Sequence, residues 1–332
     1  MAETGRQTWS GSEHRGAGLV DTLWQSSPPL TVAGVLMAVA AAAAVVGMAV
    51  DPRVITGAPA WLKPFKFAVS TAIYSLTLAW IFGFLAEWPR ARRVVGWTTA
   101  IVFVLEVTII AGQAWRGTTS HFNISTPLNA TLFGIMGAAI LIQTLVSVSV
   151  AVALWRQPFT DQPLGWALRV GMTLTIVGAM TGPLMTRPTA AQLATARADG
   201  RLTTSGAHTV GAADGGAGVP MTGWSREHGD LRVPHFVGLH AVQAMGLVAL
   251  AIRRWRRSET TRLKAVFAAA ASYATLFLWL LWEALRGRSV VAPDAPALIA
   301  MVIWALATAT AFGWIGFESR GPADSGLEEV AR

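Results

Sequence analysis

Polar side chains inside apolar stretches are the residues best placed to do chemistry in this chain. Glu106 stands in an apolar run that ends at Trp115, which puts it about 13 Å below that end of a helix. His240 and Gln243 lie three residues apart in a later run, so a helix carries them on one face. A buried carboxyl group such as Glu106 would serve as a proton donor or acceptor.

Further polar residues recur at helical spacing in the same half of neighbouring apolar runs. The predicted catalytic group is Glu106, His240, Gln243, Tyr74 and Lys66. The predicted substrate-binding group is Gln113, Arg116, Trp279, Trp282 and Glu283. Charged and amide groups are rare inside membranes and usually mark functional sites. These polar residues lie at similar depths on four predicted helices. This placement predicts a polar pocket that opens to one side of a membrane.

Structural roles remain open for several of these side chains. Glu106 would also suit an ion pair with Lys66 or Arg116. His240 and its amide neighbour would suit a hydrogen bond between two helices. Glu283 has the spacing of an ion pair with the arginine one turn further on, at the membrane surface. Each alternative predicts a satisfied polar pair instead of a reactive site.

The histidines are the candidate metal ligands, because the chain has no cysteine. The predicted ligands are His121, His208, His228 and His235. Imidazole and carboxylate ligands suit Cu, Zn or Fe, and two imidazoles can hold a haem. However, His235 and His240 point about 140° apart on a regular helix, so one ion cannot bind both there. Hydrogen bonding within an ordered cap is the alternative role for the histidines.

Composition places these residues in a membrane protein. Of the 332 residues, 53% are hydrophobic and only 13% are charged, whereas a soluble domain has about 25% charged residues. A membrane span needs roughly 20 apolar residues. We predict an all-α polytopic bundle of about eight transmembrane helices in a single domain, 31–317. The predicted spans are 31–50, 65–88, 97–115, 131–155, 164–185, 235–252, 265–285 and 295–317.

Lys and Arg in the short loops predict the orientation of this bundle, because such loops tend to stay in the cytoplasm. They gather at 90–93, 156 and 253–264, which puts both termini, including tails 1–30 and 318–332, in the cytoplasm. The same distribution accounts for most of the net charge of +8, so no nucleic-acid partner is expected. The long polar interruption 186–234 then lies outside, where it predicts a cap rich in Gly and His. Pro188 and Gly200 bracket a short predicted helix within it.

Three stretches are similar to segments of other membrane proteins. They read PAWLKPFKF at 59–67, QAWRGTTSHFN at 113–123 and GDLRVPHFVGLH at 229–240. The chain thereby resembles uncharacterised multi-pass bacterial integral membrane proteins over most of its membrane region. The resemblance implies no activity, cofactor or catalytic residue. Together with the Ala-, Arg- and Val-rich composition, it favours the plasma (inner) membrane of a bacterium.

The sequence leaves three functions open. The first is a membrane-embedded enzyme that carries out metal- or haem-assisted redox chemistry on a hydrophobic or quinone-like substrate. The second is a metal-free acid–base enzyme that acts on a polyprenyl or lipid substrate, such as a cyclase. The third is a proton-coupled transporter, for which neither an inverted repeat nor a polar path through the inner half is visible. In all three, the expected partners are the lipid bilayer and a hydrophobic small molecule.

Overall fold

The computed structural model of the chain describes residues 18–319. The rest of the two predicted tails, 1–17 and 320–332, lies outside the described residues. The N-terminal helices are α1 (Leu19–Ser26), α2 (Pro28–Val50), α3 (Leu62–Phe82), α4 (Pro89–Trp115) and α5 (Pro127–Arg156). The later helices are α6 (Gln162–Ala179), α7 (Gly182–Met185), α8 (Ala190–Asp199), α9 (Arg232–Leu239), α10 (Ala241–Ile252), α11 (Glu259–Leu285) and α12 (Ala295–Glu318).

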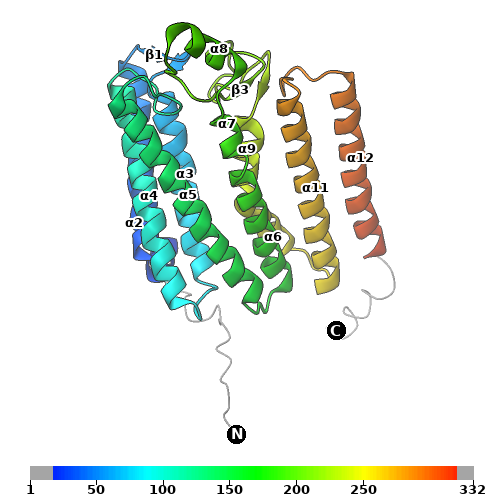
Figure 1. Cartoon of the computed structure of the whole chain (residues 1–332). Coiled ribbons are helices and arrows are strands. Elements are labelled where there is room, and N and C mark those ends of the chain that lie inside the picture. Colours follow the sequence, from blue (N-terminus) through cyan, green and yellow to red (C-terminus); the bar gives the residue numbers. More distant parts are fainter. Residues whose placement is uncertain (1–17, 320–332) are drawn as a thin grey trace, which may run out of the picture.

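The long helices form a bundle whose members run roughly side by side (Figure 1). Seven helical segments are long and apolar enough to cross a membrane, and the bent pair of α9 and α10 brings the number to eight if it counts as one span. This confirms the prediction of an all-α protein built from membrane-spanning helices. The described chain starts and ends at one end of the bundle, here called the terminal end. The opposite end is the cap end.

Apolar side chains fill the bundle toward its terminal end. The largest buried cluster joins α3, α5, α6, α10 and α11 and includes Leu78, Phe82, Leu154, Leu168, Met172, Met245 and Val266. Most of these residues lie toward the end of their helix that is further from the cap. On the outer side of the bundle, α12 packs against α11 and exposes most of its apolar side chains. The interior is therefore closed by apolar packing near the terminal end.

The span formed by α9 and α10 bends by 47° where the two helices meet at His240. Gly178 of α6 and Gly238 of α9 touch backbone to backbone, and a Cβ atom on either would clash with the other. Thr175 of α6 accepts a hydrogen bond from the Val242 amide at 3.1 Å. This bond provides a partner for the Val242 N–H group, which the bend leaves without its helical hydrogen bond. The sequence predicted an unbroken span here, and this close helix crossing is what interrupts it.

The cap covers the end of the bundle remote from the termini and extends to α9 (Figure 1). Thr189 caps the start of α8 with a side-chain hydrogen bond to Gln192, and Gly200 ends it in the left-handed conformation. This confirms the short helix predicted there. Strands β3 (Thr209–Val210) and β4 (Gly229–Asp230) pair in antiparallel fashion. A second hairpin, β1 (Val54–Ile55) with β2 (Ala58–Pro59), joins α2 to α3 at the same end.

The N-terminal segment that was predicted to be a polar tail contains an ordered helix. In α1, Leu23 is buried and belongs to the large apolar cluster. Ser27 takes an extended conformation before the two prolines that open α2, as residues before proline commonly do. Helix α1 therefore covers the terminal end of the bundle beside α2 and α3.

Candidate functional site

Glu106 lies in the interior of the bundle, where α4 packs against α2, α3 and α5. Its exposed fraction is 1%. Neither carboxylate oxygen has a hydrogen-bond partner among the described residues. The neighbouring positions Phe103 and Ile110 on α4 belong to apolar clusters. Buried polar atoms almost always have partners, so Glu106 is an exception among the described residues of the bundle.

Neither structural pairing that the sequence allowed for Glu106 is formed. Lys66 donates its hydrogen bond to the carbonyl oxygen of Thr222 in the cap, at 2.5 Å. Arg116 binds the side chains of Gln113 and Asn129. The cation that interacts with Glu106 is Lys63, which attracts it electrostatically without a hydrogen bond. We did not select Lys63 from the sequence, although it lies one helical turn before Lys66.

His240 lies at the bend between α9 and α10 and faces α3. Its Nε2 atom is 3.3 Å from Oγ of Ser70, and its ring is 4.4 Å from that of Phe236. Gln243 is one turn further on, and both of its polar side-chain atoms lack a hydrogen bond in the described structure. The bend therefore holds an imidazole and an unpartnered amide one turn apart.

Tyr74 belongs to a polar group between α3 and α5. Its hydroxyl lies 3.2 Å from Oγ of Ser147, and Nε2 of Gln143 lies 3.4 Å from the same oxygen. The carbonyl side of the Gln143 amide is buried without a partner. Sequence reasoning left out Gln143 and Ser147 as site residues, although they lie four residues apart on one face of an apolar helix.

The predicted substrate-binding residues fall into two other groups. Gln113 is buried and donates to Asn129 at 3.1 Å, so its polar atoms are satisfied near the cap end of α4. Glu283 of α11 pairs with Arg286 at 2.9 Å, as the ion-pair alternative predicted. The Arg286 guanidinium also stacks on Trp282, with 4.3 Å to the ring centroid. Trp279 is nearby on α11, and its indole nitrogen is buried without a partner in the described structure. Within residues 18–319, no hydrogen bond or ion pair joins this second group to Glu106.

His208 and Asp214 form a partly buried pair inside the cap. Nδ1 of His208 lies 2.7 Å from Oδ2 of Asp214. The same oxygen accepts a hydrogen bond from the His208 amide, and Oδ1 of Asp214 accepts one from the Thr209 amide. Burial lowers the pKa of the His208 imidazole despite this carboxylate. Burial alone would raise the pKa of Asp214, but these hydrogen bonds hold it well below its usual value. The pair fastens the start of β3 to the turn that follows it.

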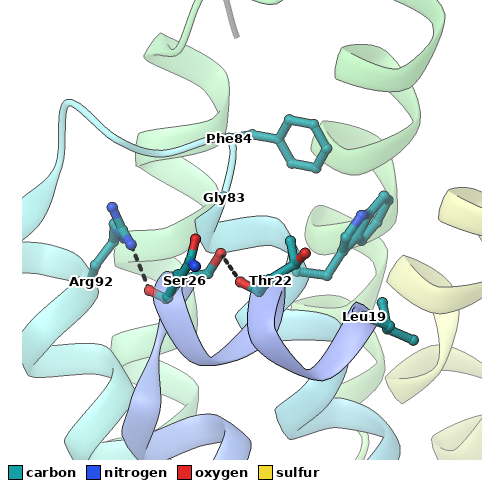
Figure 2. A pocket seen from close by; sticks show the side chains of 8 residues that line it. Leu19, Thr22, Ser26, Gly83, Phe84 and Arg92 are labelled. Atoms are coloured by element: carbon teal, nitrogen blue, oxygen red, sulfur yellow. Dashed lines mark hydrogen bonds between the residues drawn. The ribbon is translucent and has the colours of Figure 1, made fainter. Parts of the chain in front are cut away.

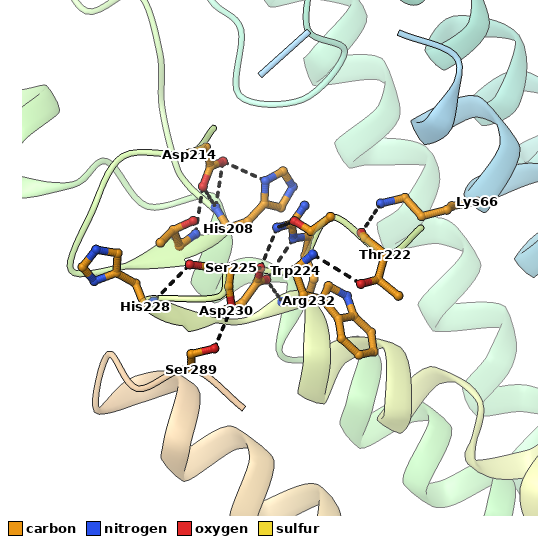
Figure 3. Close-up of polar contacts among 12 residues, drawn as sticks. Lys66, His208, Asp214, Thr222, Trp224, Ser225, His228, Asp230, Arg232 and Ser289 are labelled. Atoms are coloured by element: carbon orange, nitrogen blue, oxygen red, sulfur yellow. Dashed lines mark hydrogen bonds and ion pairs between the residues drawn. The ribbon is translucent and has the colours of Figure 1, made fainter. Parts of the chain in front are cut away.

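The other predicted metal ligands have separate environments. His121 is surrounded by the rings of Phe67, Phe122 and Phe133. Burial lowers its pKa well below the ordinary value of 6.5. Nδ1 of His235 lies 3.0 Å from the hydroxyl of Thr181. The ring of His228 points away from His208 in Figure 3.

These histidines do not converge on one point. Within residues 18–319, no three His, Asp or Glu side chains lie together as metal ligands would. The sequence-based prediction of a metal or haem site therefore gains no support from the fold. Hydrogen bonding and ring packing within an ordered cap, the alternative, describe the contacts that these histidines make.

A pocket of about 320 Å³ lies at the terminal end, between α1, the end of α3 and the start of α4 (Figure 2). Arg92 reaches across it and donates to the carbonyl oxygen of Ser26 at 2.5 Å. The pocket is on the far side of the apolar cluster from Glu106. It is therefore separate from the polar residues near the cap.

The contacts divide the polar residues of the bundle into satisfied and unsatisfied sets. Gln113 has hydrogen-bond partners on both sides of its amide. Glu283 binds Arg286 through one carboxylate oxygen, and its other oxygen has no partner in the described structure. Glu106 and Gln243 have no hydrogen-bond partner in the described structure, and the imidazole of His240 lies 3.3 Å from the Ser70 hydroxyl. Comparison of the chain with protein-family models, with curated proteins and with solved structures gave no match.

Proposed function

We propose that the protein is a membrane-embedded enzyme that uses acid–base chemistry on a lipid-soluble substrate, with Glu106 as the group that transfers the proton. One observation carries this proposal. Both oxygens of Glu106 are buried and without a partner in the described structure. A carboxyl group kept in this state destabilises the fold by about 1–3 kcal/mol. A role in proton transfer therefore explains this buried carboxyl group better than a role in stabilising the fold.

The arrangement of the interior supports access from the cap end. The terminal half is filled by Leu, Met and Val side chains, whereas Lys66, Ser70, His240 and Glu106 lie nearer the cap. A substrate with an apolar body and a polar head suits this gradient. Its apolar part would lie among the helices, and its reacting atoms would meet Glu106 away from bulk water.

The polar neighbours have distinct roles in the proposed reaction. Glu106 gives its proton to the substrate or takes one from it. His240, positioned by Ser70, and the hydroxyl of Tyr74 carry hydrogen bonds to polar substrate atoms. For a polyprenyl substrate, protonation of a double bond forms a C–H bond and a carbocation. Loss of a neighbouring proton to Glu106 then ends an isomerisation or cyclisation without any net change in atoms.

Neither the metal-assisted reaction nor transport has comparable support. The candidate histidines do not form a ligand set within the described residues. A transport path would have to pass the apolar cluster that fills the terminal half of the bundle. The acid–base enzyme requires neither feature, since its substrate can enter and leave from the cap side.

We place the enzyme in the bacterial plasma membrane with both termini in the cytoplasm. The described ends of the chain both lie at the end of the bundle opposite the cap. The loops at the terminal end carry most of the short-loop arginines, including Arg90, Arg93, Arg253 and Arg256, and such residues favour the cytoplasmic side. The cap and the entrance to the site would then face outward. Accessibility labelling of a cysteine introduced at Ala212 in the cap, in this cysteine-free chain, tests the orientation.

The activity is tested by incubating the purified protein with bacterial lipid extracts in D₂O. Mass spectrometry should find a lipid-soluble compound that gains deuterium with the wild-type protein. The Glu106→Gln variant should abolish the exchange. The matched control Glu283→Gln alters a second buried carboxyl group that belongs to the Arg286 ion pair, and it should keep the activity. Exchange that persists in Glu106→Gln would refute the assignment of the proton-transferring group.

A further inference from the structure

Three cationic side chains meet beneath the cap. Lys63 and Lys66 lie near the start of α3, and Arg232 is the first residue of α9. Lys63 interacts electrostatically with both of the others, and Lys66 interacts with Arg232. All three interactions are repulsive. The folded protein therefore concentrates positive charge at one place between two helices.

The direction of the two helices adds to this positive charge. The first turn of a helix carries a partial positive charge from its free N–H groups, and acidic residues are favoured there. Neither α3 nor α9 has an acidic residue in its first turn. Each has a cation there instead, with Lys63 in α3 and Arg232 in α9. At α9 the carboxylate of Asp230, just before the helix, accepts a hydrogen bond from the Arg232 amide at 3.0 Å and offsets this charge. The start of α3 has no acidic residue in its first turn and no side-chain cap, so it adds positive charge beside Lys63 and favours a negatively charged ligand there.

The nearby carboxylates leave the two lysines without an ion pair. Asp230 is 3% exposed and binds Arg232 through contacts of 2.5 and 2.9 Å. Asp214 is held inside the cap by its own hydrogen bonds. Lys66 donates to a backbone carbonyl. In the described part of the chain, Lys63 makes no hydrogen bond or ion pair, and its nitrogen lies 5.9 Å from the centroid of the Phe67 ring.

A glycine of the cap, Gly223, approaches two of the cations. A Cβ atom at Gly223 would be 3.7 Å from Nζ of Lys66 and 4.0 Å from Nη1 of Arg232. Gly223 also has a φ of +67°, which side-chain-bearing residues rarely adopt. Its carbonyl oxygen accepts a hydrogen bond from Arg232 at 2.6 Å. The glycine therefore brings the cap backbone close to both cations without placing a side chain between them.

We propose that Lys63, Lys66 and Arg232 form a binding site for a phosphate group beneath the cap. A phosphate monoester carries a charge of about −1.5 to −2 at neutral pH, which matches the two lysines that lack an ion pair. The guanidinium fork of Arg232 suits phosphate oxygens as well. Resting on the proposed function, this site holds the head group of the lipid-soluble substrate at the membrane surface. Its apolar chain then extends along α3 toward Ser70 and Glu106.

The test is binding by the full-length protein in a neutral detergent, with monododecyl phosphate and inorganic phosphate as probes. Monododecyl phosphate should raise the thermal unfolding temperature of the wild-type protein. Lys63→Met and Lys66→Met should each weaken its binding by at least about tenfold, since each removes a charge-assisted contact. Binding of both probes would identify free phosphate as a sufficient ligand. Binding of monododecyl phosphate alone would identify a lipid phosphate, and either result supports the site.

Two controls separate loss of the site from loss of the fold. Lys264→Met removes a lysine that pairs with Glu318 at the terminal end, and it should leave phosphate binding unchanged. Lys63→Met without ligand should unfold at no lower temperature than the wild type, because it removes a repelled cation. Absence of any effect of either phosphate on the wild type would overturn the proposal. So would full binding by both lysine variants.

The same measurement on Glu106→Gln separates this inference from the proposed function. That variant should bind monododecyl phosphate as tightly as the wild type, because Glu106 lies deeper than the phosphate site. Binding that requires Lys63, combined with activity that survives in Glu106→Gln, would refute the proposed function and leave the site standing. Loss of activity in Glu106→Gln without any phosphate binding by the wild type would refute the phosphate site and leave the proposed function standing.

Discussion

The Nε2 atom of His240 lies 3.3 Å from Oγ of Ser70, at the residue where α9 meets α10 and the span bends by 47°. This contact joins α3, in the first half of the chain, to the bent span in the second half. It also fixes the direction of an imidazole ring that would otherwise be free to rotate at a break between two helices. The bend and the hydroxyl together determine how His240 faces the interior.

Replacement of Ser70 by Ala should reduce the stability of the protein by about 1 kcal/mol, the usual net contribution of one hydrogen bond. Activity should fall further than stability because the His240 ring loses its orientation. Denaturant unfolding in mixed micelles measures the first effect, and the deuterium-exchange assay measures the second. Ser149→Ala is the matched control, since Ser149 is exposed and bonds only within its own helix. Equal activities of the two variants would contradict a positioning role for Ser70.

The cap should lose stability as the pH falls below about 6.5, the ordinary pKa of histidine. Burial lowers the pKa values of His121 and His208 in the folded state, so the unfolded chain binds protons first as the pH decreases. The stabilisation from the neutral imidazoles is complete above pH 6.5 and is lost progressively below it. Thermal unfolding between about pH 8 and pH 5 measures this dependence. A His121→Phe variant should show a smaller decrease, and a wild-type unfolding temperature independent of pH would contradict the account.

Lys66→Met should loosen the part of the cap that lies over α3. The variant loses the hydrogen bond from Lys66 to the carbonyl oxygen of Thr222, and hydrogen bonds from charged groups contribute about 1.5–3 kcal/mol. Amide hydrogen exchange in residues 217–226 should accelerate roughly tenfold or more. Exchange in α8 should stay the same, because its capping bonds are independent of Lys66. Unchanged exchange in 217–226 would show that the lysine does not hold the cap.

A larger side chain at Gly178 should disrupt the crossing of α6 and α9. A Cβ atom there would overlap the backbone of Gly238, so even Gly178→Ala should destabilise the protein by about 1–3 kcal/mol. The bend at His240 should change with it, and the activity should fall. Gly134→Ala is a suitable comparison, because no atom lies within 4 Å of a Cβ at that position. Similar unfolding curves for both variants would refute the tight crossing.

Composition and hydropathy were sufficient to predict the membrane-spanning helices. Long apolar runs have few alternatives to a helix in a bilayer, so their approximate positions follow directly from the sequence. The helix between Pro188 and Gly200 was also predictable, because its start and end depend on local signals. The burial of Glu106 followed from its place in an apolar run.

Tertiary contacts decide the features that the sequence did not predict. The bend at His240 depends on the approach of Gly178 to Gly238 and on the Thr175 hydroxyl, which come from another helix. The importance of Lys63 became visible only when the cap placed Arg232 near it. The expected convergence of the histidines failed for the same reason, because each found its partner in a different element of the cap or bundle.

We propose that the Glu106 carboxyl group transfers a proton and does not stabilise the fold. The most direct test is the unfolding free energy of Glu106→Met, with Glu283→Met as its control. Removal of a buried carboxyl group without partners should stabilise the protein by about 1–3 kcal/mol while it abolishes activity. Glu283→Met breaks the 2.9 Å ion pair with Arg286 and should destabilise the protein. A Glu106→Met protein that is less stable than the wild type would show that the carboxyl group has a structural partner, and it would contradict the account.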